Sequence, residues 1–116
     1  MEISIAKDFS PYPAGRTGQD GPNNGTRFRK EHLVPALKEA GRTGGIVTVD
    51  FDGVRSFGTS FLEEAFGGLV RLEGFEKREV QDLLELRAEK PVYRTYKRLA
   101  LRYIKEALPE ENHHAA

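Results

Sequence analysis

The sequence contains no cysteine and only three histidines, His32, His113 and His114. Without thiols there is no disulfide framework, no thiolate nucleophile and no cysteine-based zinc site. Three histidines are also too few to indicate a structural metal site. We therefore expect no metal or other cofactor, and a fold held together by its own hydrophobic core.

Long apolar runs and an excess of charge of one sign are missing as well. No apolar run approaches the roughly 20 residues that span a bilayer. The first five residues lack the basic start and apolar stretch of a secretion signal. Eighteen basic residues balance eighteen acidic ones, which argues against a generic polyanion binder but leaves room for a local basic face. These absences predict a cytoplasmic protein with no membrane partner.

The length of 116 residues fits one domain. We expect that domain to cover residues 1–109, with Pro109 ending the last helix and residues 110–116 forming a flexible tail. Residues 8–26 hold several glycines and prolines and have little apolar periodicity, so they predict a long loop. Loops of more than about 12–15 residues are usually functional or disordered.

Strand and helix patterns alternate along the chain. Three segments have the apolar pattern of strands: 2–6, 46–51 and 83–87. Three segments have apolar residues at helical spacing: 31–40, 60–73 and 91–107. Gly41 stands where a glycine ends the first helix, and Pro91 suits the first position of the last one. This order predicts an α/β fold, with a small, mostly parallel or mixed sheet of 3–5 strands and helices packed on it.

Several local details follow from the same patterns. Residues 46–51 are almost continuously apolar, so we expect a central strand covered on both faces. Ser60 and Glu63 have the spacing of a capping box, which predicts that Ser60 caps the middle helix. Gly67 and Gly68 lie inside that helix and favour close packing against the sheet.

Acids and hydroxyls cluster where the central strand ends and the next helix begins. Asp50 and Asp52 close the strand, and Thr59 and Ser60 open the helix. Ligands of open α/β sheets bind at the carboxyl ends of strands, and a helix N-terminus tolerates a phosphate. A nearby aspartate would repel a phosphate on either hydroxyl. Phosphorylation would therefore change the local electrostatics, which is typical of a regulatory switch. The plain alternative is that Ser60 is a helix cap and Asp52-Gly53 a turn.

The same stretch resembles the centre of STAS domains, the fold of sulfate transporters and anti-sigma-factor antagonists. Those domains read as an apolar strand, Asp-x-x-Gly-Val, a connector, then Asp-Ser-Ser-Gly-Leu-Gly at a helix start. Here Asp50 and Gly53-Val54 take the first positions without a gap, and Thr59-Ser60 take the two hydroxyl positions. The departures are Gly58 in place of the second Asp and Phe61 in place of the following Gly.

The run from Thr59 to Leu69, Thr-Ser-Phe-Leu-Glu-Glu-Ala-Phe-Gly-Gly-Leu, resembles a divergent bacterial group of STAS-like domains of unknown function. This resemblance implies a STAS-like fold and a non-enzymatic switch whose partner is a histidine-kinase-like ATPase. The acceptor position of phosphorylated relatives falls on Ser60, with Thr59 as the neighbouring candidate. The candidate partner-binding residues are Asp50, Asp52, Gly58, Phe61 and Glu64.

A second hypothesis is a small nucleotide- or ligand-binding module that uses the glycine-rich loop 15–25. Glycine-rich loops can offer backbone N–H groups to a phosphate, although this one lacks the Gly-Lys-Ser/Thr ending of a P-loop. Arg27 and Arg29 add positive charge at the start of a helix, the end where the dipole disfavours it, which indicates an anion or an acidic neighbour. The candidate ligand residues are Gly15, Arg16, Gly25, Arg27 and Arg29.

Two further readings have less support. An enzyme could use Asp50, Asp52 and Ser60, but no plausible base such as histidine lies near them in the sequence to activate the hydroxyl. The last helix carries Arg94, Arg98, Arg102 and Lys105 along one flank, with Lys97 nearby, which would suit nucleic acid. We expect acids within residues 63–89 to pair with these bases instead, so that nucleic-acid binding is not the favoured function.

Overall fold

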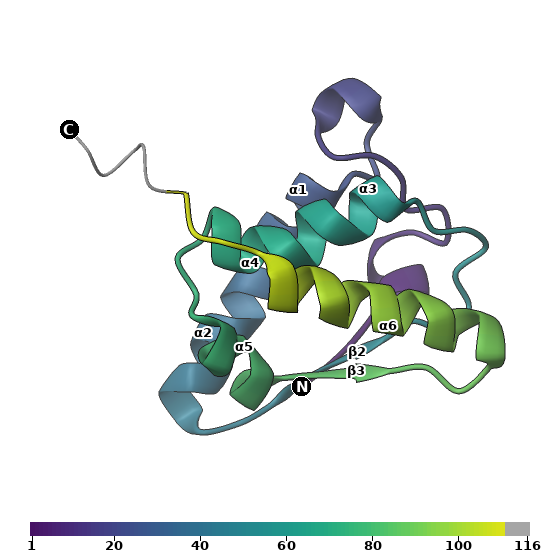
Figure 1. Cartoon of the computed structure of the whole chain (residues 1–116). Helices are drawn as coiled ribbons and strands as arrows, with labels where there is room; N and C mark the ends of the chain where they lie inside the picture. Colours follow the sequence, from purple (N-terminus) through teal and green to yellow (C-terminus); the bar gives the residue numbers. More distant parts are fainter. Residues whose placement is uncertain (111–116) are drawn as a thin grey trace.

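The computed structural model describes residues 1–110, and its three strands form one parallel sheet in the order β1-β2-β3. The strands are β1 (Glu2–Ser4), β2 (Val47–Asp50) and β3 (Leu84–Arg87) (Figure 1). Ile3 is paired with Val49, and Val49 with Leu86. The predicted α/β fold with a small parallel sheet is confirmed. Of the predicted tail, residues 111–116 lie outside the described part of the chain.

Helices account for most of the remaining chain. The first long helix consists of α1 (Gly25–Phe28), a wide turn (Arg29–Leu33) and α2 (Val34–Thr43). The second consists of α3 (Thr59–Leu62), a wide turn (Glu63–Gly67) and α4 (Gly68–Arg71). They are followed by α5 (Lys77–Leu83) and α6 (Pro91–Glu106). The predicted first strand 2–6 ends at Ser4, because a short helical turn, Ile5–Phe9, begins there and extends into the predicted loop. The loop itself contains a second turn, Gly18–Asp20.

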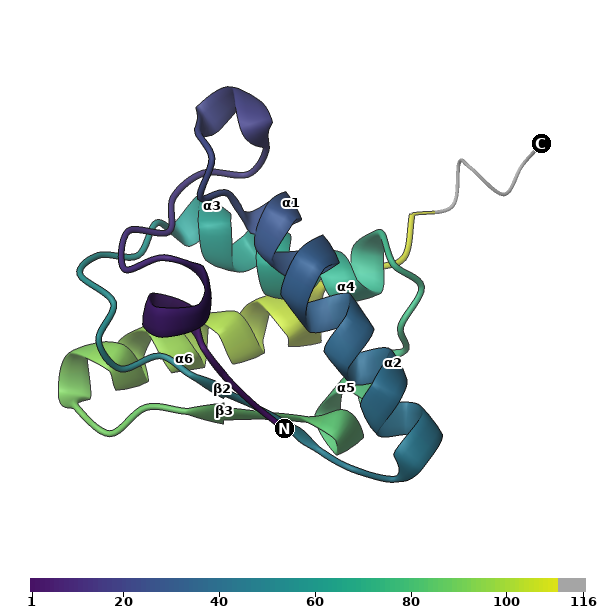
Figure 2. The same ribbon diagram turned by 180° about the vertical axis from the view of Figure 1, so that it is seen from behind.

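All the helices cover the same face of the sheet (Figures 1 and 2). The strand order explains this, because both crossovers step in the same direction and right-handed connections then lie on one side. Val47 and Val49 point into the core, whereas Thr48 and Asp50 are only half-buried on the other face. The prediction of a central strand covered on both faces is therefore wrong, since alternate positions of β2 are polar.

The first long helix begins earlier and ends later than its apolar spacing predicts. It begins at Gly25, where the Asn24 side chain accepts a hydrogen bond from the backbone N–H of Arg27 (2.8 Å). It ends at Thr43, and Gly44 adopts a left-handed φ of 79°. The predicted start near residue 31 and the predicted end at Gly41 are wrong.

Pro35 lies inside this helix, where the proline ring would clash with the preceding turn. The backbone N–H of Val34 reaches the carbonyl of Arg29, five residues back, which forms a wider turn just before the proline. This local widening explains why the helix continues through a residue that normally ends one.

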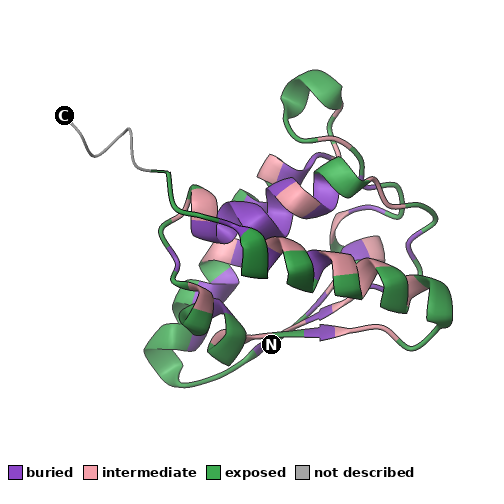
Figure 3. Ribbon diagram, in the orientation of Figure 1, coloured by how far each residue is buried: buried purple, intermediate pink, exposed green. Residues whose placement is uncertain are grey.

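Figure 3 shows the buried residues gathered between the sheet and the helices. Aromatic rings join the layers: Phe51, which follows β2, stacks on Phe66 with ring centroids 5.7 Å apart, and the Phe28 and Phe61 centroids also lie 5.7 Å apart. The helix of residues 59–71 is the most buried element and lies against both the first long helix and α6. Within residues 1–110, no helix combines the length and apolar character needed to cross a membrane.

Candidate functional site

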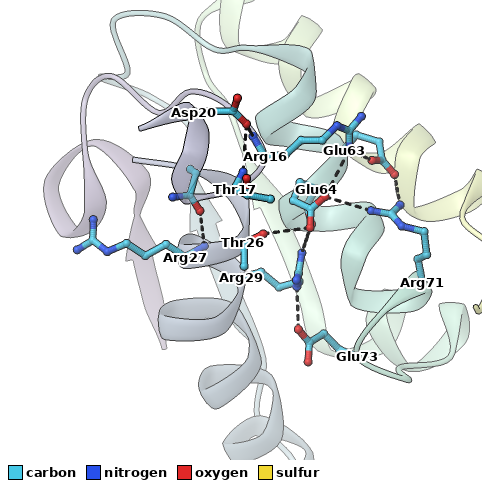
Figure 4. A network of polar contacts seen from close by, with 11 residues as sticks. Arg16, Thr17, Asp20, Thr26, Arg27, Arg29, Glu63, Glu64, Arg71 and Glu73 are labelled. Atoms are coloured by element: carbon cyan, nitrogen blue, oxygen red, sulfur yellow. Dashed lines mark hydrogen bonds and ion pairs between the residues drawn. The ribbon is translucent and has the colours of Figure 1, made fainter. Parts of the chain in front are cut away.

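A network of charged side chains joins the first long helix to the helix of residues 59–71 (Figure 4). Its centre is Arg29, whose side chain is only 2% exposed. One Arg29 nitrogen donates to the Glu64 carboxylate (2.9 Å) and to the Glu64 backbone carbonyl (2.6 Å). Another donates to the Glu73 carboxylate (2.8 Å). The acidic neighbour that positive charge at a helix start indicates is thus confirmed for Arg29.

Two glycines let the helices approach closely enough for these contacts. A Cβ at Gly25 would stand 2.8 Å from the backbone oxygen of Phe61, and a Cβ at Gly68 would collide with the Arg29 guanidinium. The backbone nearest to Gly67 from another element is the Tyr103 carbonyl of α6, 3.4 Å from a built Cβ. The glycine pair therefore permits close packing against Arg29 and α6, and the predicted packing against the sheet is wrong.

The glycine-rich loop is folded onto this network through Arg16. The Arg16 guanidinium pairs with Glu63 and lies 3.4 Å from a Glu64 oxygen. The loop backbone is fixed on both sides, because Gly25 N–H donates to the Gly15 carbonyl (2.9 Å) and Thr26 N–H to the Arg16 carbonyl (2.9 Å). The loop is thus attached to the helix of residues 59–71 by side-chain contacts.

Asp20 shapes the tip of the loop. Its carboxylate accepts hydrogen bonds from the backbone N–H groups of Arg16 (2.9 Å) and Thr17 (3.2 Å). These bonds stabilise the ionised form and lower the pKa of Asp20 below its usual value.

The network is electrically balanced. Burial alone would raise the pKa of Glu64, but the hydrogen bond and charge of Arg29 outweigh it and hold that pKa below its usual value. The hydrogen bond from Arg16 to Glu63 raises the pKa of Arg16. Glu64 also accepts a hydrogen bond from the Thr26 hydroxyl (3.1 Å). Three guanidinium groups face three carboxylates: Arg16, Arg29 and Arg71 against Glu63, Glu64 and Glu73.

This balance bears on the candidate ligand residues of the loop. Arg29 is 2% exposed, and its Nε and Nη1 donate to Glu73 and Glu64 inside the protein, so little of its guanidinium group is accessible to a bound nucleotide in this conformation. Arg27 pairs with Glu31 (3.1 Å), donates to the Pro22 carbonyl (3.0 Å) and lies 5.0 Å from the centre of the Phe9 ring. Arg16 and Arg27 thus connect the loop to helices, and Arg29 joins the two long helices; ligand binding by these arginines stays a prediction.

Thr59 and Ser60 are exposed in the first turn of the helix of residues 59–71. The helix begins two residues earlier than a Ser60 cap requires, with extended Gly58 as its N-cap and Leu62 N–H donating to the Gly58 carbonyl (3.2 Å). No side chain caps this end. The prediction that Ser60 caps the helix is therefore wrong, and its hydroxyl makes no hydrogen bond within residues 1–110.

The two aspartates lie apart from those hydroxyls. Asp50 accepts from the Asp52 N–H (2.9 Å) and from Arg87 (3.1 Å), and Asp52 accepts from the Glu89 N–H (3.2 Å). The connector 51–58 runs from the end of β2 to the start of α3 (Figure 1). In residues 1–110, no hydrogen bond or ion pair joins Asp50 or Asp52 to the helix start.

Two of the candidate partner-binding residues are buried. Phe61 is completely enclosed and contacts Phe28 and Phe57, and Glu64 belongs to the ion network. Their side chains are buried in this structure, and contact of these residues with a partner stays a prediction. Asp52 and Gly58 stay half-exposed.

Residues 24–92 match the family model of the STAS-like domain of unknown function (DUF4325). The chain belongs to this family. The comparisons with curated proteins and with solved structures found no match. The matched segment contains Ser60 and every member of the charged network except Arg16, which lies in the loop before it. The resemblance found in the sequence is confirmed.

Several residues of the charged network were not predicted from the sequence. Thr26, Glu63, Arg71 and Glu73 complete the network, and the one signal for them was positive charge at the start of a helix. No group of three or more metal-ligating side chains gathers anywhere in the described residues.

Proposed function

We propose that this STAS-like domain is a non-enzymatic protein-interaction module controlled by phosphorylation of Ser60. The observation that carries the proposal is the position of the exposed Ser60 hydroxyl, one helical turn before Glu63 and Glu64. Residues three and four apart on a helix are neighbours. A phosphate on Ser60 would therefore stand beside the carboxylates that hold Arg16.

The phosphate changes the charge of this region from balanced to negative. It brings about two negative charges and three strong acceptor oxygens, next to two existing carboxylates. Arg16 is half-exposed and is the network cation carried by the loop, so it is the one free to turn toward the phosphate. Arginine binds phosphate with paired, charge-assisted hydrogen bonds. Phosphorylation thereby draws Arg16 from Glu63 and loosens the loop from the helix.

The surface that changes consists of the loop 14–21, Gly58 and the first turn of the helix, Thr59 and Ser60. In the proposal, the unmodified domain binds its partner with this surface, and the phosphorylated domain releases it. The family resemblance supports a protein of the histidine-kinase-like ATPase class as that partner. Such an ATPase would both bind the domain and supply the phosphate.

The direct test is to purify the protein from its native host and measure its intact mass and its co-purifying chains. We expect a one-phosphate increment that disappears in Ser60→Ala and persists in Thr59→Ala, the matched control, and an ATPase among the bound chains. Protein carrying a genetically encoded phosphoserine at position 60 should no longer retain that ATPase. An unmodified and solitary protein under several growth and stress conditions would contradict the proposal.

A further inference from the structure

A row of positive charges runs along the outer face of α6. Residues 90–106 contain six cations and a single carboxylate, Glu106, although the whole chain is neutral. Arg94, Arg98 and Arg102 repeat at every fourth residue and therefore share one face of the helix. All three are exposed, whereas Ala100 and Ile104 on the opposite face are buried. Figure 3 shows exposed turns along the whole length of α6.

These cations have almost no partners within residues 1–110. Arg102 approaches Glu106 at 3.8 Å, and Arg98 reaches only the Thr95 hydroxyl at 3.4 Å. The Arg94 side chain takes part in none of the ion pairs or hydrogen bonds of these residues. The prediction that acids within residues 63–89 pair with these bases is wrong, because three of those acids, Glu63, Glu64 and Glu73, pair with Arg16, Arg29 and Arg71 instead.

The chemistry of the row suits phosphates held at regular spacing. Guanidinium groups bind phosphate oxygens in a fixed, forked geometry. Eight residues of α-helix separate Arg94 from Arg102, which places the ends of the row about 12 Å apart on a rigid rod. A duplex carries one negative charge per about 1.7 Å of its axis, so a row of this length faces several phosphates at once.

We propose that α6 binds the phosphate backbone of duplex DNA without reading its sequence. The row contains no exposed aromatic ring on which the bases of a single strand could stack. An acidic protein partner would need an apolar centre in the interface, and Leu101 is the one apolar residue exposed between Arg94 and Arg102. The inference does not depend on phosphorylation of Ser60, so the Ser60→Ala protein should bind the same duplex.

The test measures the fluorescence anisotropy of a labelled 20-base-pair duplex at several salt concentrations. Each phosphate contact contributes a slope of about −0.9 to the logarithm of affinity against the logarithm of salt. With three arginines in contact we expect a slope near −3. Replacing them together (Arg94→Gln, Arg98→Gln, Arg102→Gln) should lower the affinity more than tenfold at 50 mM salt and remove most of the slope.

The matched control removes three exposed cations elsewhere, by Lys30→Gln, Lys38→Gln and Arg78→Gln. It changes the net charge equally and should retain the affinity within about twofold. Three results would overturn the proposal: no binding of wild-type protein at low salt, equal loss in both triple variants, or tighter binding of single-stranded DNA than of the duplex. Displacement of the duplex by polyglutamate at equal charge concentration would also overturn it, in favour of an acidic protein partner.

Discussion

Arginine occurs in two contrasting settings in this molecule. In the network between the two long helices, Arg29 is buried and each guanidinium group faces a carboxylate. Along α6, Arg94 and Arg98 are exposed on the outer face, and neither forms an ion pair within residues 1–110. The first setting fixes how elements pack, and the second leaves charge free for another molecule. Net charge conceals this difference, because acids elsewhere in the sequence offset the cations of α6 and leave the whole chain neutral.

The comparison also separates effects on stability from effects on binding. Removing a buried ion from a balanced network leaves its partner charge uncompensated, which destabilises the fold. Removing an exposed cation changes stability by no more than about 0.5 kcal/mol. Replacing an arginine of the network should therefore lower the free energy of unfolding, whereas replacing an arginine of α6 should leave it nearly unchanged.

The largest effect is expected for Arg29→Met, which leaves Glu64 and Glu73 without their shared cation. We expect a loss of about 3–5 kcal/mol in the free energy of unfolding, measured with urea. Arg98→Met is the matched control and should stay within about 0.5 kcal/mol of wild type. A loss below 1 kcal/mol for Arg29→Met would remove the distinction between the two regions.

The close approach of the two long helices should be the next most sensitive feature. Gly25→Ala places a methyl group 2.8 Å from the Phe61 carbonyl, so the helices must move apart. We expect a loss of about 1–3 kcal/mol in unfolding free energy. Gly18→Ala, where nothing lies within 4 Å of the added carbon, is the control. Equal stability of the two variants would show that the contact is not tight.

Acid should weaken the network through Glu64. Its folded pKa lies below the ordinary value of 4.5, so the unfolded chain binds a proton more readily. This stabilisation is fully present above about pH 4.5 and is lost as the pH falls through the folded pKa. Urea unfolding between pH 3 and 6 should show a steeper acid loss in wild type than in Glu64→Gln. Identical pH profiles would mean that Glu64 is not held ionised by its neighbours.

The smallest effect on stability is expected for Arg16→Gln. Arg16 is 45% exposed, and ion pairs of that kind contribute at most about 1 kcal/mol. The amide hydrogens of residues 14–26 should nevertheless exchange faster, because the loop loses its attachment to Glu63. Unchanged exchange in this segment would show that other contacts hold the loop.

Local patterns predicted the order of elements well. The three strands and α6 lie close to where the apolar strand patterns, helical spacing and Pro91 place them. The STAS-like family was also predicted correctly, from a run of residues at the start of the second long helix. Strand patterns, helical spacing and a family motif all depend on residues that are close in the sequence, so the sequence alone reveals them.

The failures concern contacts between distant segments. Sequence spacing could not show that Arg29 meets Glu64 and Glu73, because those contacts depend on how two helices cross. The wrong prediction that the cations of α6 are paired has the same cause. Acids are plentiful nearby in the sequence, but Glu63, Glu64 and Glu73 pair with other arginines in the folded protein. The wide turn before Pro35 lets the helix continue through the proline, and helix propensities of single residues do not predict such a turn.

The central claim is that a phosphate on Ser60 acts through Arg16. The most direct measurement compares amide hydrogen exchange of residues 14–26 between unmodified protein and protein carrying phosphoserine at position 60. The account predicts faster exchange in this loop on phosphorylation, approaching that of Arg16→Gln, with little change in β1–β3. Exchange unaltered by the phosphate, in a protein whose loop does respond to Arg16→Gln, would contradict it.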